Sequence, residues 1–246
     1  ELKELITSLY KEEQSNKRLI GNLINKDDLV MLVTPIDSAA PKGRLILPQQ
    51  QVLRDILDSC GISVVVRETE IEQVLFLLSK KPKIVITDSQ VFKEVSNIIP
   101  DDILLTSFSI IFAKYKGILD DAILGVKKLE TLKDNDCILI SEGCTHHRQC
   151  DDIGTVKLPN LIKNYTGKNI QFEFSSGTGF PDNISKYSMI IHCGGCMLRE
   201  REVLYRYQSA KEQNIPISNY GITIAYIHGI LKRSIKIFPE LYNYLG

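Results

Sequence analysis

The sequence predicts an α/β protein of two domains, each a mainly parallel sheet flanked by helices. Short runs rich in Val, Ile and Leu alternate along the chain with longer segments of helical periodicity. A polar stretch, residues 133–136, interrupts this alternation, which continues after it. The length of 246 residues also exceeds the usual size of a single core.

We therefore divide the chain into three parts. Residues 1–26 carry apolar positions three or four apart, at Leu2, Leu5, Ile6 and Leu9, which predicts a connector helix. Residues 27–134 form the first α/β domain, and residues 135–246 form the second.

Each domain is predicted to hold four strands. They cover residues 29–33, 62–66, 83–87 and 104–110 in the first domain, and residues 137–140, 170–174, 188–191 and 215–218 in the second. The continuous β-branched run 62–66 predicts a buried strand.

Helical periodicity predicts the elements between the strands. The helices cover residues 47–60, 70–80, 90–99 and 114–132, followed by 159–165, 199–213 and 222–237. Strands separated by helices in this way indicate crossover connections in a parallel sheet.

Composition narrows the class of protein. Lys and Arg together number 30, as do Asp and Glu, so the chain lacks the surplus of cations that non-specific nucleic-acid binding needs. No apolar run is long enough to span a bilayer, and the charged N-terminus does not resemble a signal peptide. We expect a cytoplasmic protein, in which clustered cysteines are more often metal ligands or redox groups than structural disulfides.

Two clusters of cysteine and histidine are the most informative feature. The first is Cys144-Thr145-His146, and the second is His192-Cys193-Gly194-Gly195-Cys196. Each cluster follows the carboxyl end of a predicted strand, residues 137–140 and 188–191. Because ligands bind at this edge of an open parallel sheet, we expect the two clusters to meet there.

Three thiolates and a histidine are compatible with more than one kind of metal centre. Cys144, Cys193 and Cys196, with His146, His147 or His192 in a fourth position, suit a 4Fe–4S cluster with one accessible iron. The same residues suit a closed Cys₃His zinc site, and Cys193 with Cys196 alone could form a redox dithiol. Of the other cysteines, Cys60 and Cys137 are expected in the core and Cys150 in a loop.

Two nucleotide-binding motifs are absent from the sequence. It contains neither a Gly-x-x-x-x-Gly-Lys-Ser/Thr phosphate loop nor a Gly-x-Gly-x-x-Gly fingerprint. Nothing in the sequence therefore supports nucleotide hydrolysis, and we expect this chain itself not to be an enzyme.

The combination of motifs resembles the FeFe-hydrogenase maturation GTPase family, HydF. The resemblance is carried by the CxH…HCxxC pattern of the two clusters and by three further segments, residues 34–44, residues 151–154 (Asp-Asp-Ile-Gly) and residues 219–222 (Asn-Tyr-Gly-Ile). Members of this family have a GTP-binding domain, a dimerisation domain and an iron–sulfur domain. The present chain is similar to the last two.

The resemblance implies a specific function and specific partners. Cys144, Cys193 and Cys196 would hold a 4Fe–4S cluster, with His146, His192 or an exchangeable group as the fourth ligand. Residues 27–134 would form a homodimer. The protein would receive a two-iron subcluster precursor from radical-SAM maturases and deliver it to apo-FeFe-hydrogenase.

Two hypotheses of other classes stay open at this stage. A cytosolic thiol oxidoreductase would show a reversible disulfide and no iron, whereas a structural zinc adaptor would lose its fold when zinc is chelated.

Overall fold

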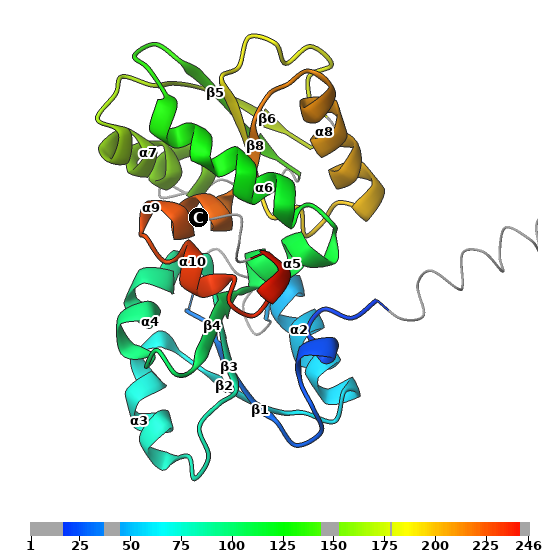
Figure 1. The fold of residues 1–246 in the computed structure, drawn as a ribbon, viewed down its shortest axis with the longest axis vertical. Coiled ribbons are helices and arrows are strands. Elements are labelled where there is room, and N and C mark those ends of the chain that lie inside the picture. The colour runs from blue at the N-terminus through cyan, green and yellow to red at the C-terminus, as the bar shows by residue number, and fades with distance from the viewer. Residues whose placement is uncertain (1–16, 37–44, 144–152, 178, 242–246) are drawn as a thin grey trace, which may run out of the picture.

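The computed structural model contains two four-stranded parallel sheets, each flanked by helices, which confirms the predicted fold class (Figure 1). The structure describes residues 17–36, 45–143, 153–177 and 179–241. The first sheet has the order β2-β1-β3-β4 and the second the order β6-β5-β7-β8. Their strands are β1 (Leu29–Val33), β2 (Ile62–Val66), β3 (Ile84–Thr87), β4 (Leu104–Ser107), β5 (Cys137–Glu142), β6 (Gln171–Ser176), β7 (Met189–His192) and β8 (Ile217–Asn219).

Helices connect these strands and cover the sheets. In chain order they are α2 (Leu47–Asp58), α3 (Ile71–Leu77), α4 (Phe92–Ile98), α5 (Phe108–Tyr115), α6 (Leu119–Val126), α7 (Leu158–Thr166), α8 (Glu200–Glu212), α9 (Tyr220–Ile227) and α10 (Leu231–Ser234). Within the described residues, no helix has the length and apolar character needed to cross a membrane.

All eight predicted strands are present, but two predicted helices are interrupted by glycine. The helix predicted over residues 114–132 is broken after α5, where Gly117 has a φ of 72°, and continues as α6. The helix predicted over residues 222–237 is broken at Gly229, whose φ is 73°, into α9 and α10. Glycine adopts this left-handed conformation without the steric cost that other residues incur.

Three other predictions need correction. The strand predicted over residues 104–110 ends at Ser107, because the apolar residues that follow it begin α5. β2 is an edge strand, not a buried one, so Ile62 and Val65 remain 50% and 42% exposed. Cys60 is exposed because it follows the end of α2 in a left-handed turn at the surface.

The predicted N-terminal helix falls mostly on residues 1–16, which lie outside the described part of the chain. From residue 17 to residue 26 the structure shows only a short 3₁₀ turn, Gly21–Leu23.

The carboxyl ends of the two sheets face each other across α5 and α9. Ser89, just after β3, lies 2.9 Å from Ser109 in α5, measured between the two Oγ atoms. A methyl group on Gly221, at the start of α9, would lie 2.3 Å from the Cβ of Ser109. Glycine at position 221 therefore allows the second domain to approach the first this closely.

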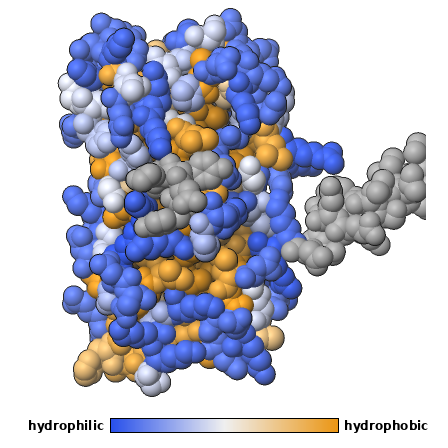
Figure 2. Space-filling model, viewed as in Figure 1, coloured by the Kyte–Doolittle hydropathy of each residue, from blue (hydrophilic) through white to orange (hydrophobic). Residues whose placement is uncertain are grey.

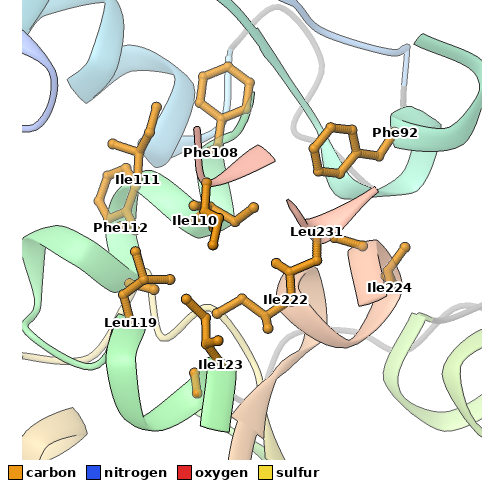
Figure 3. Packing of buried hydrophobic residues seen from close by; sticks show 14 of the residues in the cluster. Phe92, Phe108, Ile110, Ile111, Phe112, Leu119, Ile123, Ile222, Ile224 and Leu231 are labelled. Carbon is orange, nitrogen blue, oxygen red and sulfur yellow. The ribbon is translucent and has the colours of Figure 1, made fainter. Parts of the chain in front are cut away.

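Apolar side chains fill the space between the sheets and form one continuous core (Figure 3). The labelled residues come from α4, α5, α6, α9 and α10: Phe92, Phe108, Ile110, Ile111, Phe112, Leu119, Ile123, Ile222, Ile224 and Leu231. Burying one such side chain contributes about 1.5–3 kcal/mol relative to leaving it exposed. The two domains are therefore held in a defined relative position.

Candidate metal centre at the carboxyl edge of the second sheet

The order of the strands in the second sheet indicates where a ligand would bind. From β5 the chain continues to β6 on one side of the sheet, whereas from β7 it continues to β8 on the other side. The loops that follow β5 and β7 therefore diverge at a topological switch point, where open parallel sheets bind their ligands. Gly143 follows β5, and the segment Cys193-Gly194-Gly195-Cys196, called here the CGGC loop, follows β7.

The structure brings the ends of these two loops into contact. The backbone N–H of Gly143 donates a hydrogen bond to the Sγ of Cys193 at 3.0 Å. Gly143 is the residue directly before Cys144. Cys144, His146, His147 and Cys150 themselves lie outside the described residues.

Cys193 is fixed by the backbone around it. Its N–H donates to the carbonyl of Ser141 at 2.8 Å, which continues the pairing of β7 with β5. Besides the bond from Gly143, its Sγ accepts a longer one from the N–H of Gly195, at 3.4 Å. Hydrogen bonds to sulfur from backbone amides are typical of thiolates that ligate iron–sulfur clusters and help to set their redox potential.

The two glycines of the loop have different surroundings. Gly195 has a φ of 61°, and a methyl group there would lie 3.0 Å from the side chain of Val203. A methyl group on Gly194 would meet nothing within 4 Å. The tight turn of the loop thus requires glycine at position 195 rather than at 194.

The two cysteines differ in exposure. Cys193 is half-buried, whereas Cys196 is exposed. A group held by both thiols would thus be open to solvent on the side of Cys196, and a second molecule could reach it.

A buried polar network lies beneath the loop, and sequence analysis missed most of it. Arg206, in α8, is only 1% exposed and reaches under the end of β7. Its guanidinium group donates to the carbonyl of Gly177 at 2.7 Å, to the Nε2 of His192 at 3.1 Å and to the Oγ of Ser141 at 3.4 Å. An arginine is expected on the surface, so no sequence signal distinguished this one.

His192 is part of this network. Its Nδ1 lies 2.6 Å from the carbonyl oxygen of Cys193, so Nδ1 carries the proton and donates it. Nε2 is then the acceptor for Arg206. Burial is the main reason that the pKa of His192 falls to about 4; the hydrogen bond to Cys193 opposes this, and the charges of Arg206 and Lys116 add to it. His192 is therefore a neutral, fully buried side chain with both ring nitrogens engaged.

Lys116 is a second charged residue that sequence analysis missed. It follows α5 and is 6% exposed. Its Nζ donates to the carbonyl of Gly195 at 2.6 Å and to that of Gly194 at 3.3 Å. The loop is therefore held from the side of the first sheet as well as from below.

Two residues of the segments that resemble HydF, Tyr220 and Gly154, lie next to Glu142 at the carboxyl end of β5. The hydroxyl of Tyr220 donates to Oε1 of the buried Glu142 at 3.3 Å. A methyl group on Gly154 would lie 2.4 Å from that hydroxyl and 2.5 Å from Oε1 of Glu142. Asn219 caps α9 by accepting the N–H of Ile222 at 2.9 Å. Packing thus explains the glycine and asparagine of these segments.

The donor set fits a metal held by sulfur. The described residues supply two thiols, with amides aimed at one of them, and the residue next to Gly143 is a third cysteine. Within the described part of the chain, no three potential ligands among His, Cys, Asp and Glu come together. Among the described residues, Cys193 and Cys196 are therefore the sulfur donors at this edge of the sheet.

Comparison with protein-family models decides the family. The model of the hydrogen maturase F dimerisation domain matches residues 19–117, and that of the hydrogen maturase F tetramerisation domain matches residues 120–237. The chain belongs to the hydrogen maturase F (HydF) family. Its domains indicate a role in hydrogenase maturation and the ability to form oligomers. No curated protein matches the chain.

The two family models meet within the α5–α6 junction. Residue 117 ends the first match and residue 120 begins the second. The helix α6, which follows, packs on β8 of the second sheet. The CGGC loop accordingly belongs to the tetramerisation domain, whereas Lys116 belongs to the dimerisation domain.

Proposed function

We propose that this HydF protein is a non-catalytic scaffold and carrier for hydrogenase maturation. Cys144, Cys193 and Cys196 would hold a 4Fe–4S cluster. The protein would then take up a two-iron subcluster precursor from radical-SAM maturases and deliver it to apo-FeFe-hydrogenase. The observation that carries the proposal is the bond from Gly143 to the sulfur of Cys193, since it brings the chain entering Cys144 to the CGGC loop.

The surroundings of the thiols favour a cluster that exchanges a ligand. When bound, the cluster would supply an iron that can accept a ligand from the guest. The backbone holds Cys193 firmly, whereas Cys196 lies at the surface. A site of this kind can retain its cluster through the thiolates and still expose one side to a partner protein. Such thiols also require a reducing compartment, so we place this activity in the cytoplasm.

For the fourth ligand we favour His146 or an exchangeable group over His192. Both ring nitrogens of His192 already have hydrogen-bond partners. Turning this ring toward the metal would break both of its hydrogen bonds and remove one acceptor of the buried guanidinium of Arg206, which is costly. We therefore assign His192 a supporting role beneath Cys193.

We also propose that the protein is a homodimer formed through the first sheet. β2 is the edge strand of that sheet, so its outer backbone groups have no strand beside them in the described chain. Apolar side chains of β2 and of the neighbouring helix are exposed as well, among them Leu57 at 56%. An unpaired edge flanked by apolar side chains is suited to pair with another copy.

A transfer experiment tests the carrier function. The 246-residue chain is reconstituted anaerobically with iron and sulfide and loaded with a two-iron complex that carries carbonyl and cyanide ligands. After removal of unbound complex, the loaded chain is mixed with apo-FeFe-hydrogenase. We expect carbonyl and cyanide infrared bands on the chain, followed by hydrogen evolution from the hydrogenase.

A matched variant shows whether the site is responsible. Cys196→Ala, treated identically, is expected to retain little of the complex and to activate little hydrogenase, whereas Cys60→Ala should behave like the wild type. Equal activation by the wild type and by Cys196→Ala would contradict the proposal. Isolation of a tightly bound zinc ion and no iron would favour the structural zinc alternative instead.

A further inference from the structure

Lys116 is held in a defined conformation by the groups around it and is not a flexible surface residue. The chain turns at Gly117, and the backbone N–H groups of Lys116 and Ile118 bond to the carbonyls of Phe112 and Ala113, at 2.9 and 3.0 Å. The ammonium group lies 6.0 Å from the centre of the Phe112 ring. Both the start and the end of this side chain are therefore fixed by neighbouring groups.

The buried ammonium group of Lys116 forms no ion pair with a carboxylate of the described residues. Glu200 is a carboxylate whose charge raises the pKa of Lys116, but it forms its ion pair with Lys17. Removing an ammonium group from water is costly unless other groups compensate for it.

The groups that do face Lys116 are those of the CGGC loop. Two carbonyls of the loop accept its hydrogen bonds, at 2.6 and 3.3 Å. Burial lowers the pKa of Lys116, whereas negative charge on Cys196, on Cys193 and on Glu200 raises it. The arrangement places a buried cation, held by the carbonyls of the loop, beside two thiols that would carry negative charge once they bind a metal.

We propose that Lys116 is a positioning residue that ties the CGGC loop to the dimerisation domain and supplies the buried positive charge facing the thiolate ligands. The second half of this proposal rests on the proposed function, because it requires a cluster on Cys193 and Cys196. The first half concerns the chain without metal.

Three variants separate the tether from the charge. Lys116→Met removes the charge and all donors, whereas Lys116→Gln removes the charge but keeps one N–H₂ group as a donor. Lys114→Met is the matched control, because Lys114 lies two residues earlier, in α5, and pairs with Glu240 at 2.7 Å instead of with the loop.

The tether is measured on the metal-free 246-residue chain by amide hydrogen exchange. Hydrogen bonds to charged groups stabilise by about 1.5–3 kcal/mol, so exchange across residues 194–199 should accelerate about tenfold or more in Lys116→Met. Lys116→Gln should show a smaller effect, and Lys114→Met none. Unchanged exchange in Lys116→Met, in protein that melts as a folded domain, would overturn the tether.

The effect of the charge is tested on the reconstituted protein, by measuring the midpoint potential of the cluster in a redox titration with dithionite. Reduction adds a negative charge to the cluster, which a nearby buried cation stabilises. Lys116→Met and Lys116→Gln should therefore both have a more negative midpoint potential than the wild type and Lys114→Met. Equal potentials in all four proteins would overturn the role of the charge. If the wild type binds no cluster, the proposed function fails and the charge role fails with it, while hydrogen exchange still decides the tether.

Discussion

The Nε2 of His192 lies 3.1 Å from the Nη1 of Arg206, directly beneath the loop that carries Cys193 and Cys196. This pair joins the end of β7 to α8 and is almost completely buried. The loop therefore does not rest on apolar packing alone, since its first cysteine is held through the ring of His192. The stability of this pair should determine how well the thiols are positioned.

Arg206→Met is expected to destabilise the protein. The substitution leaves the Nε2 of His192 and the carbonyl of Gly177 without partners in a buried site, at a cost of about 2–4 kcal/mol. Urea unfolding followed by circular dichroism measures this loss. Arg201→Met, an exposed site on the same helix, serves as the control and should change stability by less than about 0.5 kcal/mol. Equal stability of the two variants would show that the network contributes little.

Gly195→Ala and Gly194→Ala form a second matched pair. Alanine at position 195 would have to adopt a left-handed conformation, which costs about 1–2 kcal/mol, and would also crowd Val203. Alanine at position 194 meets no atom within 4 Å. We expect Gly195→Ala to bind less iron on reconstitution and Gly194→Ala to bind as much as the wild type. Identical iron content in both variants would mean that the turn at Gly195 is not needed for the site.

The exposed edge of β2 leads to a prediction about self-association. A lysine in place of Ile62 would put like charges on both copies at an edge-to-edge contact and should raise the dissociation constant of the dimer roughly tenfold or more. Sedimentation velocity measures this change. Leu124→Lys alters a side chain of the same exposure, 50%, on α6, which packs on β8 of the second sheet, and should leave the dimer intact. A dimer that survives Ile62→Lys unchanged would have to use another surface.

Figure 2 shows a further apolar area at the bottom of the molecule, over the end of α3. Phe76 and Leu77 in this helix are 89% and 70% exposed. We assign no partner to this area. The variant Phe76→Ser separates non-specific hydrophobic association from the specific edge contact of β2. It should leave the dimer dissociation constant within about twofold of the wild type.

Much of the fold could be predicted because its signals are local. The apolar runs that form β1 and β3 are short and bounded by polar residues, which is typical of buried parallel strands. The burial of β2 was mispredicted because the same β-branched pattern occurs in central and edge strands. Only strand order distinguishes the two, and strand order depends on tertiary packing.

The interruptions of the helices were harder to predict. The predicted helix 114–132 has an almost continuous helical pattern, and a single glycine does not necessarily end a helix. In the structure Gly117 ends α5, so that Lys116 points to the CGGC loop and α6 packs on the second sheet. This consequence depends on contacts about 80 residues apart in sequence, which no local pattern records.

Some residues of the candidate site could likewise be predicted from local sequence patterns, and others could not. The CGGC loop could be predicted because cysteine spacing and its place after a strand are both visible in the sequence. Arg206 and Lys116 could not, since charged residues are normally solvated and only the structure shows these two to be buried. The cluster on Cys144, Cys193 and Cys196, and the role of His146, stay predictions.

The central claim is that three cysteines from two loops hold one iron–sulfur cluster. The most direct test is the iron and acid-labile sulfide content of the anaerobically reconstituted chain, measured with its EPR spectrum, for the wild type and for Cys144→Ala. We expect about four iron and about four sulfide ions per wild-type chain, with a reducible paramagnetic signal, and a loss of both in Cys144→Ala. A normal cluster in Cys144→Ala, or zinc in place of iron in the wild type, would contradict the account.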